Sequence, residues 1–301
     1  MPILLVVDDS ELDRRMIGSL LEEDLDWLVT YAKNGEEALD LMQTAPPDAV
    51  VTDLVMPGVD GLQLVETIRR DFDRIPVIVV TGQGSEDLAS QALRKGAASY
   101  VPKSKLADGL LETVRQVLSL AMADRNLDQL MQRSVNSRHK FQLENDPVLC
   151  ATFIEFVQQT LYRMAFCDVA DRLHVAVALE EALINAMCHG NLELAGGDLP
   201  TVRRQLHESG SSELIAERRT DQRFQNRHIL VGFDVTPGRA QFVIRDQGSG
   251  FDWSLVTRQM KTEPKSQEEK RGLVLIHSFM DEVGFNDQGN EIRMVINRPA
   301  A

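Results

Sequence analysis

Short apolar runs alternate with amphipathic helical segments through the first 120 residues, and this alternation most constrains the fold. The predicted strands cover residues 3–7, 27–32, 49–52, 77–80 and 99–102. A helical pattern follows each of them, over residues 10–23, 34–43, 60–70 and 85–95 and from about residue 107 onward. Successive strand–helix units predict a doubly wound α/β fold with a parallel sheet, because parallel neighbours need a crossover helix between them.

Polar residues stand where these strands end. Asp8 and Asp9 follow the first strand, and Asp53 follows the third. Thr81 ends the fourth strand and Lys103 follows the fifth. The carboxyl ends of parallel strands meet at one edge of a sheet, where ligands of open α/β sheets bind. We therefore expect these five side chains to form one site.

Three carboxylates in one site repel one another and resist joint ionisation without a counter-charge. Mg²⁺ prefers a few carboxylates together with water and a phosphate oxygen, so Asp8, Asp9 and Asp53 are its candidate ligands. Lys103 offers a fixed positive charge to a phosphoryl group, and Thr81 offers a hydroxyl donor. The pattern predicts phosphoryl transfer to a carboxylate.

Four motifs carry a resemblance over residues 1–122: V-V-D-D-S at 6–10, V-T-D-L-V-M-P-G at 51–58, V-T-G at 80–82 and Y-V-P-K at 100–103. The segment resembles the receiver domains of two-component response regulators, which have a flavodoxin-like (βα)5 fold. The resemblance implies that a sensor histidine kinase supplies a phosphoryl group to Asp53, that Asp8 and Asp9 hold Mg²⁺, that Thr81 is the switch hydroxyl, and that Lys103 contacts the phosphate. Tyr100 is either the switch aromatic of this family or an aromatic lying over the last strand.

Residues 123–139 are expected to form a helical connector. Apolar residues keep a helical spacing from Leu110 to Ala121, and Leu130 and Met131 extend it beyond the polar stretch 124–126. The last helix of the first domain is therefore expected to continue as a signalling helix. Pairing of this helix in a homodimer and a monomeric chain both remain open. The polar segment 134–140 is the expected hinge.

Three features of the second half indicate nucleotide chemistry. Glu181 and Asn185 lie four residues apart and share one helical face, where a polar pair is costly without a ligand such as a metal-bound triphosphate. Asp246 begins D-Q-G-S-G and can accept a hydrogen bond from an exocyclic amine such as that of adenine. Its glycines let the backbone approach a ligand. Gly272 opens a helix whose free N–H groups suit phosphate.

The boxes E-A-L-I-N at 181–185, D-Q-G-S-G at 246–250 and R-G-L-V-L at 271–275 resemble those of Bergerat-type ATPases, over residues 140–301. These include histidine kinases, gyrase subunits and bacterial anti-sigma-factor serine kinases, and E-E-A-L-I-N-A-M-C-H-G-N looks most like the last group. The resemblance implies an α/β sandwich that binds ATP and Mg²⁺. The residues it implicates are Glu181 as catalytic base, Asn185 as Mg²⁺ ligand, and Asp246, Gly248, Gly250, Arg271 and Gly272 as ATP contacts. Lys270 replaces the glycine usual before R-G-L and is a further candidate phosphate contact.

The composition of the chain limits the kinds of partner that it can bind. A formal net charge of −14 and a pI near 4.9 argue against a broad surface for nucleic acid or anionic membrane. The start lacks a basic, apolar leader, no uncharged apolar run approaches 20 residues, and the three cysteines lack C-x-x-C spacing. We expect a cytoplasmic protein. The polar insertion 195–227 carries several arginines and is either a solvated helical face or a partner-binding arm.

These features favour an ATP-dependent serine/threonine protein kinase of a partner-switching pathway, controlled by an aspartyl phosphate on Asp53. Its expected partners are an anti-anti-sigma-like antagonist protein and a sigma factor. Two alternatives remain open: an ATP-binding partner-switching module with little kinase turnover, and an unorthodox histidine kinase. A missing histidine box and the amino-terminal receiver count against the histidine kinase.

Overall fold

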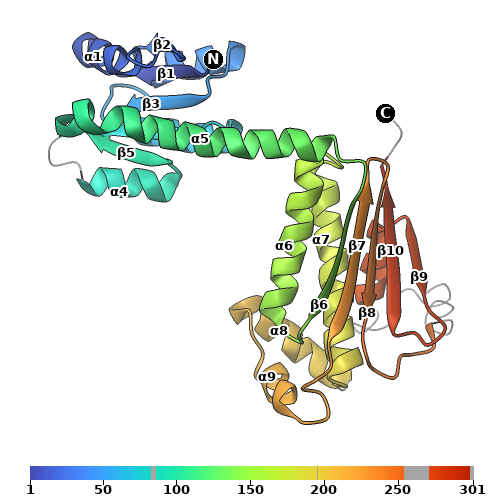
Figure 1. The fold of residues 1–301 in the computed structure, drawn as a ribbon. Helices are drawn as coiled ribbons and strands as arrows, with labels where there is room; N and C mark the ends of the chain where they lie inside the picture. The colour runs from blue at the N-terminus through green and yellow to red at the C-terminus, as the bar shows by residue number, and fades with distance from the viewer. Residues whose placement is uncertain (83–85, 195, 254–270, 299–301) are drawn as a thin grey trace. The chain divides into compact units, whose positions relative to one another are not determined.

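The computed structural model describes residues 1–82, 86–194, 196–253 and 271–298. The chain forms two compact units, Met1–Asn126 and Leu127–Ala301 (Figure 1). Within the described ranges, no helix combines the length and apolar character that crossing a membrane requires.

The first unit is a parallel sheet of five strands with order β2-β1-β3-β4-β5. Its strands are β1 (Ile3–Val7), β2 (Leu28–Ala32), β3 (Ala49–Asp53), β4 (Val77–Thr81) and β5 (Ser99–Pro102). Its helices are α1 (Glu11–Leu21), α2 (Gly35–Thr44), α3 (Gly61–Asp71), α4 (Glu86–Lys95), the 3-10 turn η1 (Lys103–Lys105) and α5 (Leu106–Gln132). Separate apolar clusters lie on the two faces of the sheet. The predicted doubly wound fold is confirmed.

Helix starts in this unit are fixed by side-chain caps. Ser10 accepts the backbone N–H of Asp13, and Asn34 accepts that of Glu37. Asp60 forms a capping box at the start of α3. These caps start α1 and α2 shortly after β1 and β2, whereas residues 54–59 separate the end of β3 from the cap of α3.

Helix α5 continues through the polar stretch 124–126 to Gln132, as expected. Its first turns bury Leu110, Val114 and Leu118 in the core of the first unit. Arg125 near the end of that unit forms an ion pair with Asp48. The helix is therefore anchored in the first unit as far as Arg125, whereas its residues 127–132 belong to the second unit, where Asp128 pairs with Arg163.

The second unit is an antiparallel sheet of five strands with order β6-β7-β8-β10-β9. Its strands are β6 (Ser137–Leu143), β7 (Ile229–Thr236), β8 (Arg239–Arg245), β9 (Glu282–Phe285) and β10 (Glu291–Asn297). Its helices are α6 (Pro147–Arg163), α7 (Val169–Ile184), the π-helical turn η2 (Asn185–Asn191), the 3-10 turn η3 (Gly196–Asp198), α8 (Leu199–Ser209), α9 (Glu213–Thr220) and α11 (Arg271–Phe279). Helices α6 and α7 lie against one face of the sheet (Figure 1), and α11 packs on α7. The predicted α/β sandwich is confirmed.

Two segments differ from the sequence-based expectations. Residues 137–140, expected as part of a hinge, belong to β6, where His139 and Phe141 face an aromatic cluster while Arg138 and Lys140 face outward. Alternation of inward and outward side chains is typical of a strand. The pattern is not evident in the sequence when His139 is counted as a polar residue. The segment after residue 195 folds into α8 and α9, and only its outer side is a solvated face. Its inner side buries four apolar side chains in the core of the second unit: Leu199, Val202, Ile215 and Phe224.

Gly61 at the start of α3 lies against the backbone of the proposed phosphorylation site. A Cβ atom at this position would lie 2.1 Å from the carbonyl oxygen of Asp53 and 2.7 Å from Cα of Leu54. Backbone atoms cannot give way cheaply, so Gly61→Ala is expected to destabilise the first unit by about 1–3 kcal/mol. Urea unfolding followed by Trp27 fluorescence, in a Trp253→Phe background, measures this unit alone.

Gly109→Ala in α5 is the matched control. A Cβ there meets no atom within 4 Å, and alanine favours a helix interior by up to ~1 kcal/mol. This control is expected to be neutral or stabilising. Equal stability of Gly61→Ala and the parent chain would contradict the packing described here.

Candidate functional site

Three carboxylates meet at the carboxyl edge of the parallel sheet. Asp8 is fully buried after β1, Asp53 is buried at the end of β3, and Asp9 is exposed. One oxygen from each lies within 4.8 Å of the other two. This is an all-oxygen ligand set of the kind that Mg²⁺ takes, so the residues present fit the ion that the sequence implies.

Lys103 lies beside the same carboxylates. Its Nζ is 3.2 Å from Oδ2 of Asp8, 3.3 Å from Oδ2 of Asp53 and 2.6 Å from Oδ2 of Asp13. Burial would lower the pKa of Lys103, but the hydrogen bond to Asp13 and the charges of Asp53 and Asp8 hold this pKa above its ordinary value. The ammonium is therefore a permanent positive charge at the site.

Asp13 is a site residue that the sequence analysis missed. It stands in the first turn of α1, where an acidic residue is ordinarily read as a partner of the helix dipole. Its contact with Lys103 is shorter than the contacts that Lys103 makes with Asp8 and Asp53. Asp13 thus competes with the other carboxylates for the ammonium.

The other predicted receiver residues lie on neighbouring strand ends. Thr81 is buried at the end of β4, next to β3 in the sheet. Tyr100 on β5 is 43% exposed, so its ring lies outward. Oδ1 of Asp53 accepts the N–H of Leu54 at 2.8 Å, which leaves Oδ2 on the side of Lys103.

Burial raises the pKa of Asp8 against the opposing effects of the Ser10 N–H group and Lys103. A raised folded-state pKa means that the folded chain binds the proton more tightly than the unfolded chain. Stability therefore falls as pH rises between the two values and stays lower above them. At neutral pH without a divalent ion, the ionised Asp8 is a destabilising charge.

Asp8→Asn is accordingly expected to raise the melting temperature of the first unit in EDTA at pH 7 and to remove its stabilisation by Mg²⁺. A variant that melts lower in EDTA, or that keeps the full Mg²⁺ response, would contradict this assignment. Asp40→Asn, a change at an exposed position of α2, is the control and should alter neither quantity.

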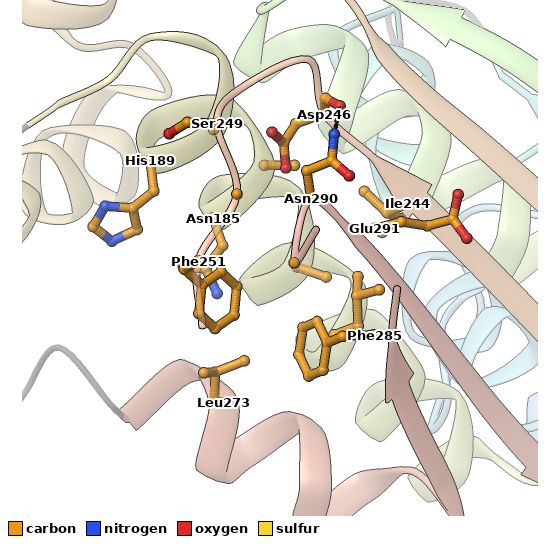
Figure 2. A pocket seen from close by; sticks show the side chains of 16 residues that line it. Asn185, His189, Ile244, Asp246, Ser249, Phe251, Leu273, Phe285, Asn290 and Glu291 are labelled. Carbon is orange, nitrogen blue, oxygen red and sulfur yellow. Dashed lines mark hydrogen bonds between the residues drawn. The ribbon is translucent and has the colours of Figure 1, made fainter. Parts of the chain in front are cut away.

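A second candidate site is a pocket in the second unit with a volume of about 370 Å³ (Figure 2). That size is within the range of small-molecule sites. The π-helical turn supplies Asn185, the end of β8 supplies Asp246, and α11 supplies Leu273. Phe251 and Phe285 line its apolar side and meet edge-on, at 5.5 Å between ring centroids.

Asp246 is held by the glycines around it. Its Oδ1 accepts the N–H of Gly248 at 2.8 Å, and burial raises its pKa above the ordinary value. A Cβ on Gly190 would lie 2.2 Å from Cγ of Asp246, and one on Gly248 would lie 2.4 Å from the carbonyl oxygen of Gly190. Gly250 has a φ of +75° and packs on the carbonyl of Gln288. These positions require glycine because backbone and carboxylate lie in direct contact.

Glu181 lies one turn before Asn185. Whereas Asn185 lines the pocket, the carboxylate of Glu181 contacts the side chain of Arg203. Its Oε1 accepts a hydrogen bond from Nη1 of Arg203 at 2.8 Å, and Oε2 lies 2.7 Å from Nη2. A Cβ on Gly272 would lie 2.4 Å from Oε2. The structure thus brings the E-A-L-I-N box and the start of α11 together, as the motifs imply. Lys270 lies outside the described residues, and Arg271 is placed only as the first residue of α11.

The sequence analysis missed Asn290, which lines the pocket, and Asn191, which supports the loop beside it. Asn290 Nδ2 donates to the carbonyl of Asp246 at 3.1 Å, and Asn191 Oδ1 accepts the N–H of Gln247 at 2.8 Å. Asn191 is fully buried and also bonds Asn145 at 2.8 Å. In the sequence, only the dipeptide G-N after His189 and the turn before β10 pointed to these two asparagines, and each pattern is also common in ordinary loops.

Comparison with known proteins assigns each of the two units to a domain family. Residues 4–115 match the model of the response regulator receiver domain, and residues 143–296 match that of the histidine kinase-like ATPase domain. The fold and the sites therefore define a receiver domain fused to an ATPase-type domain. The chain belongs to the family of histidine kinase-like ATPase domains, and its first unit belongs to the response regulator receivers.

Curated relatives match the first unit. Response regulator MprA of Mycolicibacterium vanbaalenii is 36% identical over 125 residues, which are 41% of this chain and 54% of that protein. Chemotaxis protein CheY of Halobacterium salinarum is 31% identical over 116 residues, 38% of this chain and 96% of that protein. Hybrid signal transduction histidine kinase D of Dictyostelium discoideum is 32% identical over 130 residues, 42% of this chain but 8% of that protein. The chain thus spans about half of the MprA protein and less than a tenth of the hybrid kinase.

A solved structure also resembles the first unit. The receiver domain of the Francisella response regulator 1452 has 30% sequence identity and a TM-score of 0.37. The match covers 40% of this chain and 98% of that one.

Proposed function

We propose that this chain is a response regulator in which phosphorylation of Asp53 controls an ATP-dependent serine/threonine protein kinase. The observation that carries the proposal is the convergence of Asn185, Asp246 and the start of α11 on one pocket, with Glu181 at its border. In this proposal Asp246 would accept a hydrogen bond from the amine of adenine, and Phe251 and Phe285, which line the pocket, would offer apolar surface to the ring.

The residues that would hold Mg²⁺ and phosphate in this pocket are Asn185 and the N-terminus of α11. The ion would neutralise phosphate charge in phosphoryl transfer. Glu181 would accept the proton of the acceptor hydroxyl as that oxygen bonds to the γ-phosphorus. Gly272, which has no Cβ, lets the start of α11 lie directly against the carboxylate, and this supports a role of Glu181 at the same end of the pocket.

On the receiver side, we propose that a sensor histidine kinase phosphorylates Asp53, with Mg²⁺ held by Asp8, Asp9 and Asp53. Thr81 and Lys103 would contact the phosphoryl oxygens, and Tyr100 would move inward with Thr81. The exposed ring of Tyr100 and the burial of Thr81 support this assignment. The proposed partners of the kinase are an anti-anti-sigma-like antagonist and a sigma factor in the cytoplasm.

One observation favours a second candidate, an ATP-binding module with little turnover. Both oxygens of Glu181 lie against the guanidinium of Arg203, so the proposed base is engaged within the chain. A module of this kind would bind nucleotide and exchange partners without transferring phosphate.

The position of His139, the one histidine in connector residues 123–139, argues against the histidine kinase alternative. His139 lies on β6, stacks near Phe141 and Phe233, and meets the ring of Phe156 edge-on at 4.9 Å. Its Nε2 hydrogen-bonds Ser137 Oγ at 2.9 Å. A phospho-accepting histidine needs a free ring nitrogen that reaches ATP, whereas this ring is packed in the aromatic cluster.

Incubation of the full chain with radiolabelled ATP, Mg²⁺ and candidate antagonist proteins tests the proposal. Label on a serine or threonine of a partner is expected, and Asn185→Ala should reduce it at least about a hundredfold by removing a metal ligand. Asn136→Ala, an exposed change in the same unit, is the control. ATP binding without transfer would favour the module, and acid-labile self-label would favour the histidine kinase.

A further inference from the structure

Arg203 comes from the insertion but belongs to the border of the nucleotide pocket. Its Nη1 donates a hydrogen bond to Oε1 of Glu181 at 2.8 Å and its Nη2 lies 2.7 Å from Oε2, so the guanidinium contacts both oxygens of the carboxylate. The adjacent Arg204 is exposed. One of two neighbouring arginines is therefore directed at the proposed base.

The pair is substantially shielded from water. The side chain of Glu181 is 12% exposed and that of Arg203 is 33% exposed. Oε2 of Glu181 is buried and accepts no well-angled hydrogen bond among the described residues, so its close approach to Nη2 is mainly an attraction of charges. A buried carboxylate depends on such a cation, because loss of the cation leaves an uncompensated charge.

Packing holds the guanidinium in place. Val202, next to Arg203, is fully buried, and Leu199 anchors the start of α8 in the same core. On the other side, a Cβ on Gly272 would lie 3.5 Å from Nη2 of Arg203. The pair thus lies at the junction of α7, α8 and α11, and α8 must shift, or Arg203 change rotamer, before Glu181 is released.

We propose that Arg203 is a positioning residue that restrains phosphoryl transfer by engaging both oxygens of Glu181. In the transfer, the acceptor O–H bond breaks and its proton goes to Glu181, while the acceptor oxygen bonds to the γ-phosphorus and ADP leaves with the bridging oxygen. Glu181 takes that proton only after Arg203 withdraws. The inference rests on the proposed kinase function and makes the insertion the element through which its rate is controlled.

ADP production from Mg-ATP by the full chain, with and without antagonist protein, tests this inference. Arg203→Ala is expected to raise kcat about tenfold and to leave the KM for ATP unchanged. A tenfold rise is smaller than the rate enhancement that a general base typically supplies. Arg203→Lys should rise less, because an ammonium remains beside the carboxylate but lacks the bidentate fork. Arg204→Ala is the matched control and should equal the parent chain. A rise in kcat alone is a result that loss of a merely structural contact does not give.

An unchanged or lower kcat in a folded Arg203→Ala chain overturns the inference. If the parent chain turns over ATP and Arg203→Ala matches it, the kinase function stands and the restraint falls. If both bind ATP and neither makes ADP, both proposals fall together. Thermal melting checks that the variant is folded, and if Arg203→Ala is not, Arg203→Lys is judged by the same criterion.

Discussion

In each unit of this chain, buried or half-buried carboxylates lie beside a single cation that ties together the segments carrying them. In the first unit, the ammonium of Lys103 lies within 3.3 Å of oxygens from Asp8, Asp13 and Asp53. In the second, the guanidinium of Arg203 engages Glu181. A carboxylate away from water is costly unless a cation compensates it, so each pair fixes the segments that carry its members.

The two pairs also connect local chemistry to longer-range structure. Lys103 joins the end of β5 to the ends of β1 and β3, and a phosphoryl group on Asp53 would compete for its charge. Arg203 joins α8 to α7 beside the start of α11. In both places an incoming phosphate is an anion that a positively charged side chain already in the site can meet. The chemistry proposed for each unit therefore begins with the redistribution of an existing ion pair.

Much of the architecture was predictable because its signals are local and periodic. The parallel sheet followed from five apolar runs with capped helices between them, and Asp8, Asp53 and Lys103 followed from their places at strand ends. The Asp246 loop was predictable from its glycines, which the packing requires: a Cβ on Gly250 would lie 1.9 Å from the carbonyl oxygen of Gln288.

The misses have a different physical origin. Arg203 lies in a segment whose mixed charges look solvated, and its contact with Glu181 bridges 22 positions of the sequence through the packing of α8. Asp13 looked like a helix-dipole residue until the fold brought Lys103 to it. The start of β6 was hidden because His139 was taken as polar, whereas its ring packs among phenylalanines. Such contacts depend on tertiary structure and leave little periodic signal.

The most direct test of the central claim is the affinity of the full chain for Mg-ATP with Asp53 phosphorylated and unphosphorylated. Calorimetric titration of the unmutated chain with Mg-ATP, before and after treatment with acetyl phosphate, measures the coupling between phosphorylation of Asp53 and nucleotide binding. We predict a change in Kd of about fivefold or more, the size typical of allosteric coupling, which disappears in Asp53→Asn. Equal affinities for the phosphorylated and unphosphorylated chain would contradict control of the ATPase domain through Asp53.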